Sequence, residues 1–216
     1  MSTEKLDALI IRNLSDLDTA AKRLYDDIQI RIAKAIDDIV ESWTKKCSWV
    51  TTSTFHKDEI IYIAPPEWKS PDPQDADNWL AWFAFEPGSG DNIGGDDATS
   101  YFDTFWLTRL CGVGHGMLCF RWHYGAEALG VTKPKWKKFV QVHIQRIVEK
   151  TGFTYEDSTG CFFNPLRVDS EKLAVAIEED AAEDALQPIR DALDQLLAAT
   201  PEFDALLKDA KKHFIK

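Results

Sequence analysis

Three side chains near residue 60 have types and spacing that could hold a metal ion. Asp58 precedes the apolar segment EIIYIA, and Glu67 and Lys69 follow it with one residue between them. Metal-dependent nucleases use an acid, then a strand bearing an acid-x-Lys sequence, because the acids hold magnesium and the lysine stabilises charge. Pro65 and Pro66 argue against a central strand here. A divergent metal-dependent hydrolase or nuclease is therefore the alternative hypothesis and not the leading one.

A second group of carboxylates lies in the glycine-rich segment 87–100. Asp91, Asp96 and Asp97 could offer oxygen ligands to calcium, but the EF-hand spacing and its terminal glutamate are absent. The alternatives are a solvent loop and a partner-binding loop. The histidines lack a zinc-type spacing, and no serine or cysteine has the local context of a nucleophile. The sequence thus predicts no metal, no cofactor and no catalytic residue, which makes an enzyme the less favoured class.

The tightest acidic cluster places five carboxylates within seven positions. They are Glu178, Glu179, Asp180, Glu183 and Asp184. On a helix they would span more than one face, and like charges four residues apart repel each other. A solubilising surface is the simple interpretation. The functional interpretation is a face that meets a basic partner.

The distribution of charge favours protein partners over nucleic acid. The chain carries a net charge of −11, with 4 basic and 12 acidic residues over 47–132. Such a chain repels phosphate and attracts basic protein surfaces. The segment 133–152 is the exception, with a net charge of +5 and Trp136 available for stacking. It could contact nucleic acid, or it could be a solvated face paired with acidic helices.

The tryptophans indicate where the sheet lies. Six of the eight fall between Trp49 and Trp122, within segments of period-two alternation. Most should be core, because aromatic rings dominate burial in sheets. Trp68 differs, since it lies in a proline-rich polar segment. It could be an exposed interface anchor, and packing back over the sheet is the favoured interpretation.

The order of elements predicts a single α+β domain over 1–216. Residues 1–46 are expected to be helical, 47–125 to form a mostly antiparallel sheet of four to six strands, and 132–216 to be mainly helical. The expected strands are 48–55, 59–64, 78–86, 101–111 and 116–124, with a hairpin turn at 112–115 and a further short hairpin over 153–163. In the last region Asp169 should cap a helix, Pro188 should restart it, and Thr200-Pro201 should open another.

Apolar residues recur every three or four positions from Leu17 to Trp43, which predicts one long amphipathic helix over 16–46, after a short helix at 3–12. Thirty-one helical residues extend about 46 Å. This length exceeds what one small sheet covers, so the overhang must meet other helices or a partner. It would also let two copies of the chain pair.

The remaining features bear on location. The four cysteines form no C-x-x-C pair, which favours reduced thiols. No signal peptide is visible, and the longest aromatic-aliphatic run, 79–85, is far too short to cross a bilayer. We therefore expect a cytoplasmic, non-enzymatic, acidic protein-binding module. An inhibitor, antitoxin, immunity protein or nucleic-acid mimic would fit these properties.

Overall fold

Six antiparallel strands form one sheet in the order β1-β2-β3-β4-β6-β5. The computed structural model describes residues 2–69, 79–87, 105–113 and 116–215. The strands are β1 (Val50–Ser53), β2 (Ile61–Ala64), β3 (Ala81–Pro87), β4 (Leu118–Tyr124), β5 (Thr154–Glu156) and β6 (Cys161–Leu166). The α+β prediction, with four to six mostly antiparallel strands, is confirmed.

Helices make up the two ends of the chain. Before the sheet come α1 (Thr3–Arg12), α2 (Leu14–Arg23), the π-helical turn η1 (Leu24–Ile28) and α3 (Gln29–Cys47). Short helices between strands are α4 (Phe55–Asp58), the 3-10 turn η2 (Pro66–Trp68), α5 (Trp106–Cys111), α6 (Lys133–Val140) and α7 (Ile144–Thr151). The chain ends with α8 (Ser170–Glu178), the 3-10 turn η5 (Ala182–Leu186) and α9 (Gln187–Phe214).

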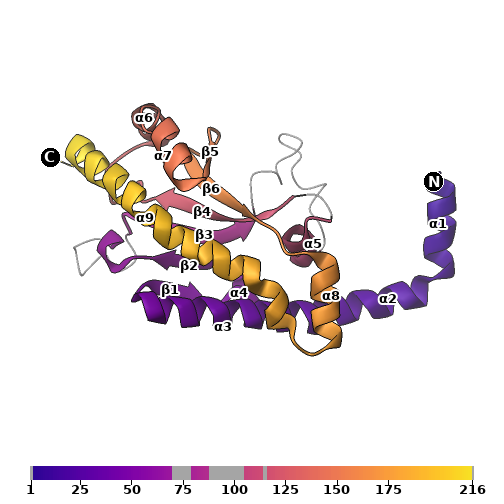
Figure 1. The fold of residues 1–216 in the computed structure, drawn as a ribbon. Helices are drawn as coiled ribbons and strands as arrows, with labels where there is room; N and C mark the ends of the chain where they lie inside the picture. The colour runs from indigo at the N-terminus through magenta and orange to yellow at the C-terminus, as the bar shows by residue number, and fades with distance from the viewer. Residues whose placement is uncertain (1, 70–78, 88–104, 114–115, 216) are drawn as a thin grey trace.

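Helices α3 and α9 cover one face of the sheet, with α9 crossing it and α3 running beside β1 (Figure 1). Phe203 of α9 stacks on Trp122 of β4, with ring centroids 4.8 Å apart. The Trp43 indole donates a hydrogen bond to Asp194, 2.9 Å away, which ties α3 to α9. The core is therefore the layer between these two helices and the sheet.

Trp68 belongs to this core, as the favoured interpretation predicts, and the hypothesis of an exposed interface anchor is wrong. Its side chain is only 2% exposed and packs against Phe83 and Trp122. Its indole nitrogen donates to Asp204 of α9 at 2.6 Å. Pro66 starts a turn of 3-10 helix that folds the indole over the sheet. The polar residues next to Trp68 in sequence therefore do not indicate that its side chain is exposed.

Two secondary-structure predictions were also wrong. Residues 106–111 form helix α5 and not a strand, because Trp106 and Leu110 share one buried face and Gly112 ends the helix with φ +61°. Strand β4 pairs instead with β3 and β6. Helix α9 also continues through Pro201, where a new helix was expected to begin.

The basic segment is two helices, α6 and α7, and Trp136 is fully buried between them and the sheet. Its indole donates to the carbonyl of Gly160 at 2.9 Å. Lys137 and Arg146 pair with Asp157 and Glu202, at 3.0 and 3.4 Å. Trp136 is therefore not available for stacking on bases, and the two ion pairs agree with the favoured alternative, in which this segment pairs with acidic residues of the same fold.

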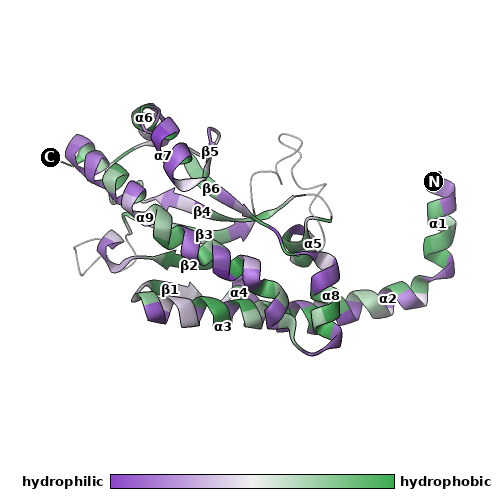
Figure 2. Ribbon diagram, viewed as in Figure 1, coloured by the Kyte–Doolittle hydropathy of each residue, from purple (hydrophilic) through white to green (hydrophobic). Residues whose placement is uncertain are grey.

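The first two helices extend away from the sheet (Figure 1), and neither α1 nor α2 buries a single residue. We call this segment, residues 3–23, the arm. Figure 2 shows hydrophobic and hydrophilic positions side by side along it. Large apolar side chains there remain 40–70% exposed: Leu6, Leu9, Ile10, Ile11, Leu14 and Leu17. The long N-terminal helix is thus present, and no residue of α1 or α2 is buried in the described chain.

Candidate functional site

The sheet face opposite α3 and α9 carries a cluster of charged side chains. Phe83, Phe120 and Trp122 point into the core, so their alternating neighbours in β3 and β4 point to the other face. The side chains gathered there are Glu86, Arg121, His123, Glu156, Thr159 and Cys161. Arg121 and Glu156 are buried, and Glu86 and His123 are partly buried.

Arg121 is the centre of this cluster. Its Nε lies 2.7 Å from Oε1 of Glu86, and its Nη1 pairs with Oε2 of Glu156. The Thr159 hydroxyl donates to the same Glu156 oxygen at 2.5 Å. One guanidinium held between two carboxylates compensates charges that would otherwise be costly to bury. The arrangement joins β3, β4 and β5 across the sheet.

His123 lies between a carboxylate and a thiol. Its Nε2 is 3.0 Å from Oε1 of Glu86, and its Nδ1 is 4.0 Å from Sγ of Cys161. Burial disfavours the charged imidazole, but the hydrogen bonds of Cys161 and Glu86 outweigh it and raise the pKa of His123 to about 9. Nearby, burial raises the pKa of the Cys119 thiol to about 12, which makes that thiol inert.

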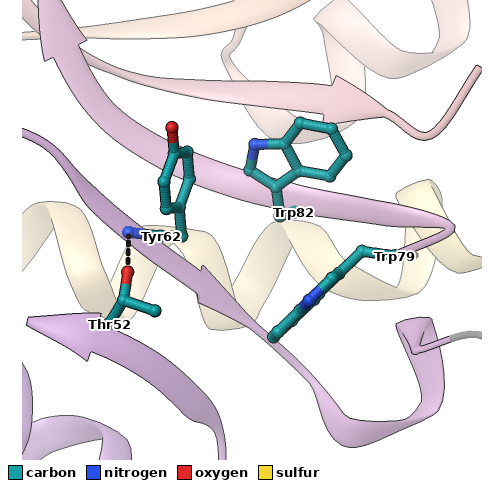
Figure 3. Close-up of a pocket in the computed structure, with 4 residues that line it drawn as sticks. All are labelled: Thr52, Tyr62, Trp79 and Trp82. Carbon is teal, nitrogen blue, oxygen red and sulfur yellow. Dashed lines mark hydrogen bonds between the residues drawn. The ribbon is translucent and has the colours of Figure 1, made fainter. Parts of the chain in front are cut away.

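An aromatic pocket lies beside this cluster. It is lined by Thr52, Tyr62, Trp79 and Trp82 and has a volume of about 290 Å³ (Figure 3). The other side of Trp82 stacks on His123, with ring centroids 5.3 Å apart. The pocket therefore shares one wall with the charged cluster.

An apolar groove lies at the root of the arm, where η1 meets α5 and α8. It has a volume of about 250 Å³ and is lined by Leu24, Leu107, Thr108, Cys111, Val113, Ser170, Leu173, Ala174 and Ile177. Leu24 follows directly on α2, and Ile177 directly precedes the acidic cluster. The groove thus connects the exposed apolar side chains of the arm to the carboxylates beyond α8.

The five carboxylates of that cluster, which we call the acidic corner, are all exposed. Asp180 lies 3.7 Å from Arg31, and Glu183 lies 3.8 Å from Arg190. Asp180 has φ +56°, because the chain turns there between α8 and η5. The corner is therefore a turn that gathers the carboxylates at one end of the molecule.

Asp91, Asp96 and Asp97, the carboxylates of the glycine-rich segment, lie outside the described residues.

The three side chains of the nuclease hypothesis are spread along β2. Asp58 ends α4, before β2, and accepts a hydrogen bond from Thr54 at 2.9 Å. Glu67 lies in η2 after the strand, and four strand residues span about 13 Å. Lys69 lies over the Trp79 ring, 5.2 Å from its centroid. Within the described ranges, no three His, Cys, Asp or Glu side chains are grouped so that they could hold a metal ion.

The charged cluster and the pocket were largely missed from the sequence. Alternation places Arg121 and His123 on one face of β4, but Glu86 joins them only through the pairing of β3 with β4. Glu156 is contributed by β5, which belongs to the separate β5–β6 hairpin. The alternation of residues in β2 and β3 allows Tyr62 and Trp82 to lie on the same face of the sheet. This alternation is the signal in the sequence that could have indicated the pocket.

Comparisons of the chain with protein-family models, with curated proteins and with solved structures give no match. None of the helices in the described ranges combines the length and the apolarity that a bilayer span requires. All four cysteines are free thiols.

Proposed function

We propose that this protein binds another protein through a continuous surface formed by the arm, the apolar groove and the acidic corner. The observation that carries the proposal is the arm, because its two ten-residue helices bury no residue in their own chain. Helix α1 is a separate ten-residue helix, and isolated helices shorter than about 12–15 residues are marginal in water, while α2 is the exposed beginning of the continuous helical segment 14–47. A partner that covers their apolar side chains would supply the missing stabilisation.

The chemistry of the surface indicates the kind of partner. Apolar side chains run from Leu6 through Leu24 into the groove, and carboxylates follow from Glu178 onward. A complementary segment would present an apolar face to the arm and groove, with lysine or arginine beside the acidic corner. The net charge of −11 would speed the encounter with such a basic surface. Free thiols suit a cytoplasmic inhibitor, antitoxin or immunity protein.

The other partner to test for this surface is a second copy of the chain. Helix α2 begins with Asp16 and Asp18 and ends with Lys22 and Arg23. Two antiparallel copies of α2 would place acids opposite bases. The net charge opposes this self-association, whereas it favours a basic partner, so we assign the surface to a different protein.

The test compares capture by three forms of the chain. The wild type should retain a partner that the double variant Leu9→Glu, Leu17→Glu loses, because the charges interrupt the apolar face. A variant with amides at all five positions of the acidic corner should bind more weakly, with a smaller dependence on salt. The captured protein is then purified and titrated directly.

Two results would contradict the proposal. Equal binding of the purified partner by wild type and the arm variant would remove the arm from the interface. A stable dimer of the purified chain that becomes monomeric in the arm variant would assign the arm to a second copy.

A further inference from the structure

The aromatic pocket has walls at right angles to each other. Tyr62 of β2 and Trp82 of β3 meet edge to face, with ring centroids 6.4 Å apart and planes at 82°. Trp79, just before β3, adds a third ring (Figure 3). Thr52 of β1 completes the lining. Three rings from different positions on the sheet therefore surround one space.

These rings lie at the edge of the core, since Trp79 and Trp82 pack against it without being fully buried. Tyr62 is 39% exposed, and Trp79 and Trp82 are partly exposed, whereas Trp68 and Trp122 are buried. Apolar side chains gathered in one exposed patch mark a binding site more often than single exposed side chains do. The volume of about 290 Å³ is at the small end of ligand pockets. It fits a small head group and not a large cofactor.

The chemistry of the lining selects a particular kind of ligand. Ring faces carry negative potential and attract cations. Lys69 already demonstrates this attraction, since its Nζ lies 5.2 Å from the centroid of Trp79. Among the described residues that line the pocket there is no carboxylate, and the Thr52 hydroxyl already accepts the Tyr62 amide at 3.3 Å. The acceptors on this described lining are the hydroxyl oxygens of Thr52 and Tyr62, and a cation without N–H groups needs neither of them.

We propose that the pocket binds the trimethylammonium head of a small organic cation. Such a head spreads its charge over methyl groups, is weakly hydrated and needs no acceptor. The ring faces of Tyr62 and Trp82 provide both apolar contact and electrostatic attraction, and the Trp79 ring, which already has Lys69 at 5.2 Å, adds apolar contact. This site is separate from the arm and the acidic corner and does not depend on the protein-binding proposal.

The experiment titrates the full chain with choline and, separately, with 3,3-dimethyl-1-butanol, its neutral analogue of the same shape. Calorimetry should show choline binding at least about tenfold more tightly than the alcohol. Proton NMR should show the N-methyl signal moving upfield, because ring currents shield protons held over aromatic faces. Equal affinity for the two compounds, or no binding of choline, would overturn the proposal.

Matched tyrosine variants locate the site. Tyr62→Leu should weaken choline binding by about tenfold, since it removes one wall while keeping an apolar side chain. Tyr25→Leu changes an exposed tyrosine on η1, outside the pocket, and should leave binding unchanged. Circular dichroism and thermal unfolding confirm that both variants fold. If Trp82→Phe is also folded and binds choline as wild type does, and Tyr62→Leu has no effect, the pocket is not the site.

Discussion

Helix α3 and the arm have the same kind of amphipathic sequence but very different surroundings. Nine residues of α3 are buried, whereas α1 and α2, which precede it in one nearly continuous helical segment, bury none. The difference is the sheet and α9, which lie beside α3 and not beside the arm (Figure 1). An apolar stripe therefore predicts that something covers it, but it does not say whether the cover comes from the same chain.

The largest loss of stability should come from removing an aromatic ring from the core beneath α9. Phe203→Ala should lower the free energy of unfolding by about 3–5 kcal/mol, because it leaves a cavity against Trp122 and Phe83. Leu197→Ala, on the exposed side of the same helix, is the control and should change it by less than about 0.5 kcal/mol. Urea unfolding measures both. Equal losses would contradict the assignment of the core to the layer beneath α9.

The charged cluster on the other sheet face should have the next largest effect. Arg121→Met should cost about 3 kcal/mol of unfolding free energy, because Glu86 and Glu156 lose the cation between them. Urea unfolding at pH 7 measures this loss. A loss of less than about 1 kcal/mol would contradict the assignment of Arg121 as the cation that compensates both carboxylates.

His123 should make stability depend on pH in the alkaline range. Its pKa is raised from 6.5 to about 9 in the folded chain, so its stabilisation is complete below pH 6.5 and is lost as pH rises through 9. The shift corresponds to roughly 3 kcal/mol at most. The difference in unfolding free energy between wild type and His123→Gln should therefore narrow between pH 6.5 and 10. A difference that stays constant over this range would show that His123 is not charged in the folded state.

The smallest effect on stability should come from the arm. Leu17→Ala should change the unfolding free energy of the isolated chain by less than about 0.5 kcal/mol, because Leu17 is 46% exposed and α2 buries no residue. The corresponding truncation in α3, Ile36→Ala, removes a fully buried side chain and should lower the unfolding free energy by about 2–5 kcal/mol. A comparable cost at both positions would show that the arm already packs against its own chain.

The sequence predicted most of the architecture, because periodicity and capping are local signals. Asp169 caps α8 as expected, with its carboxylate accepting the amides of Glu171 and Lys172. The predictions failed where long-range contacts decide. Trp68 looks exposed until Asp204, 136 residues away, accepts its indole proton.

The candidate sites were predictable only in part for the same reason. The acidic corner was visible because its residues are neighbours in sequence. The charged cluster was not, because strand register brings together Glu86, Arg121 and Glu156 from three different strands. The aromatic pocket likewise depends on β1, β2 and β3 lying in that order.

Hydrogen exchange of the arm, with and without the captured partner, tests whether another protein covers the arm. Amides of residues 3–23 should exchange rapidly in the isolated chain, while those of α3 and α9 exchange slowly, because only the latter helices are packed. Adding the partner should slow exchange in the arm. Slow exchange in the arm of the isolated monomer, or an arm that stays unprotected when the partner is bound, would contradict the account.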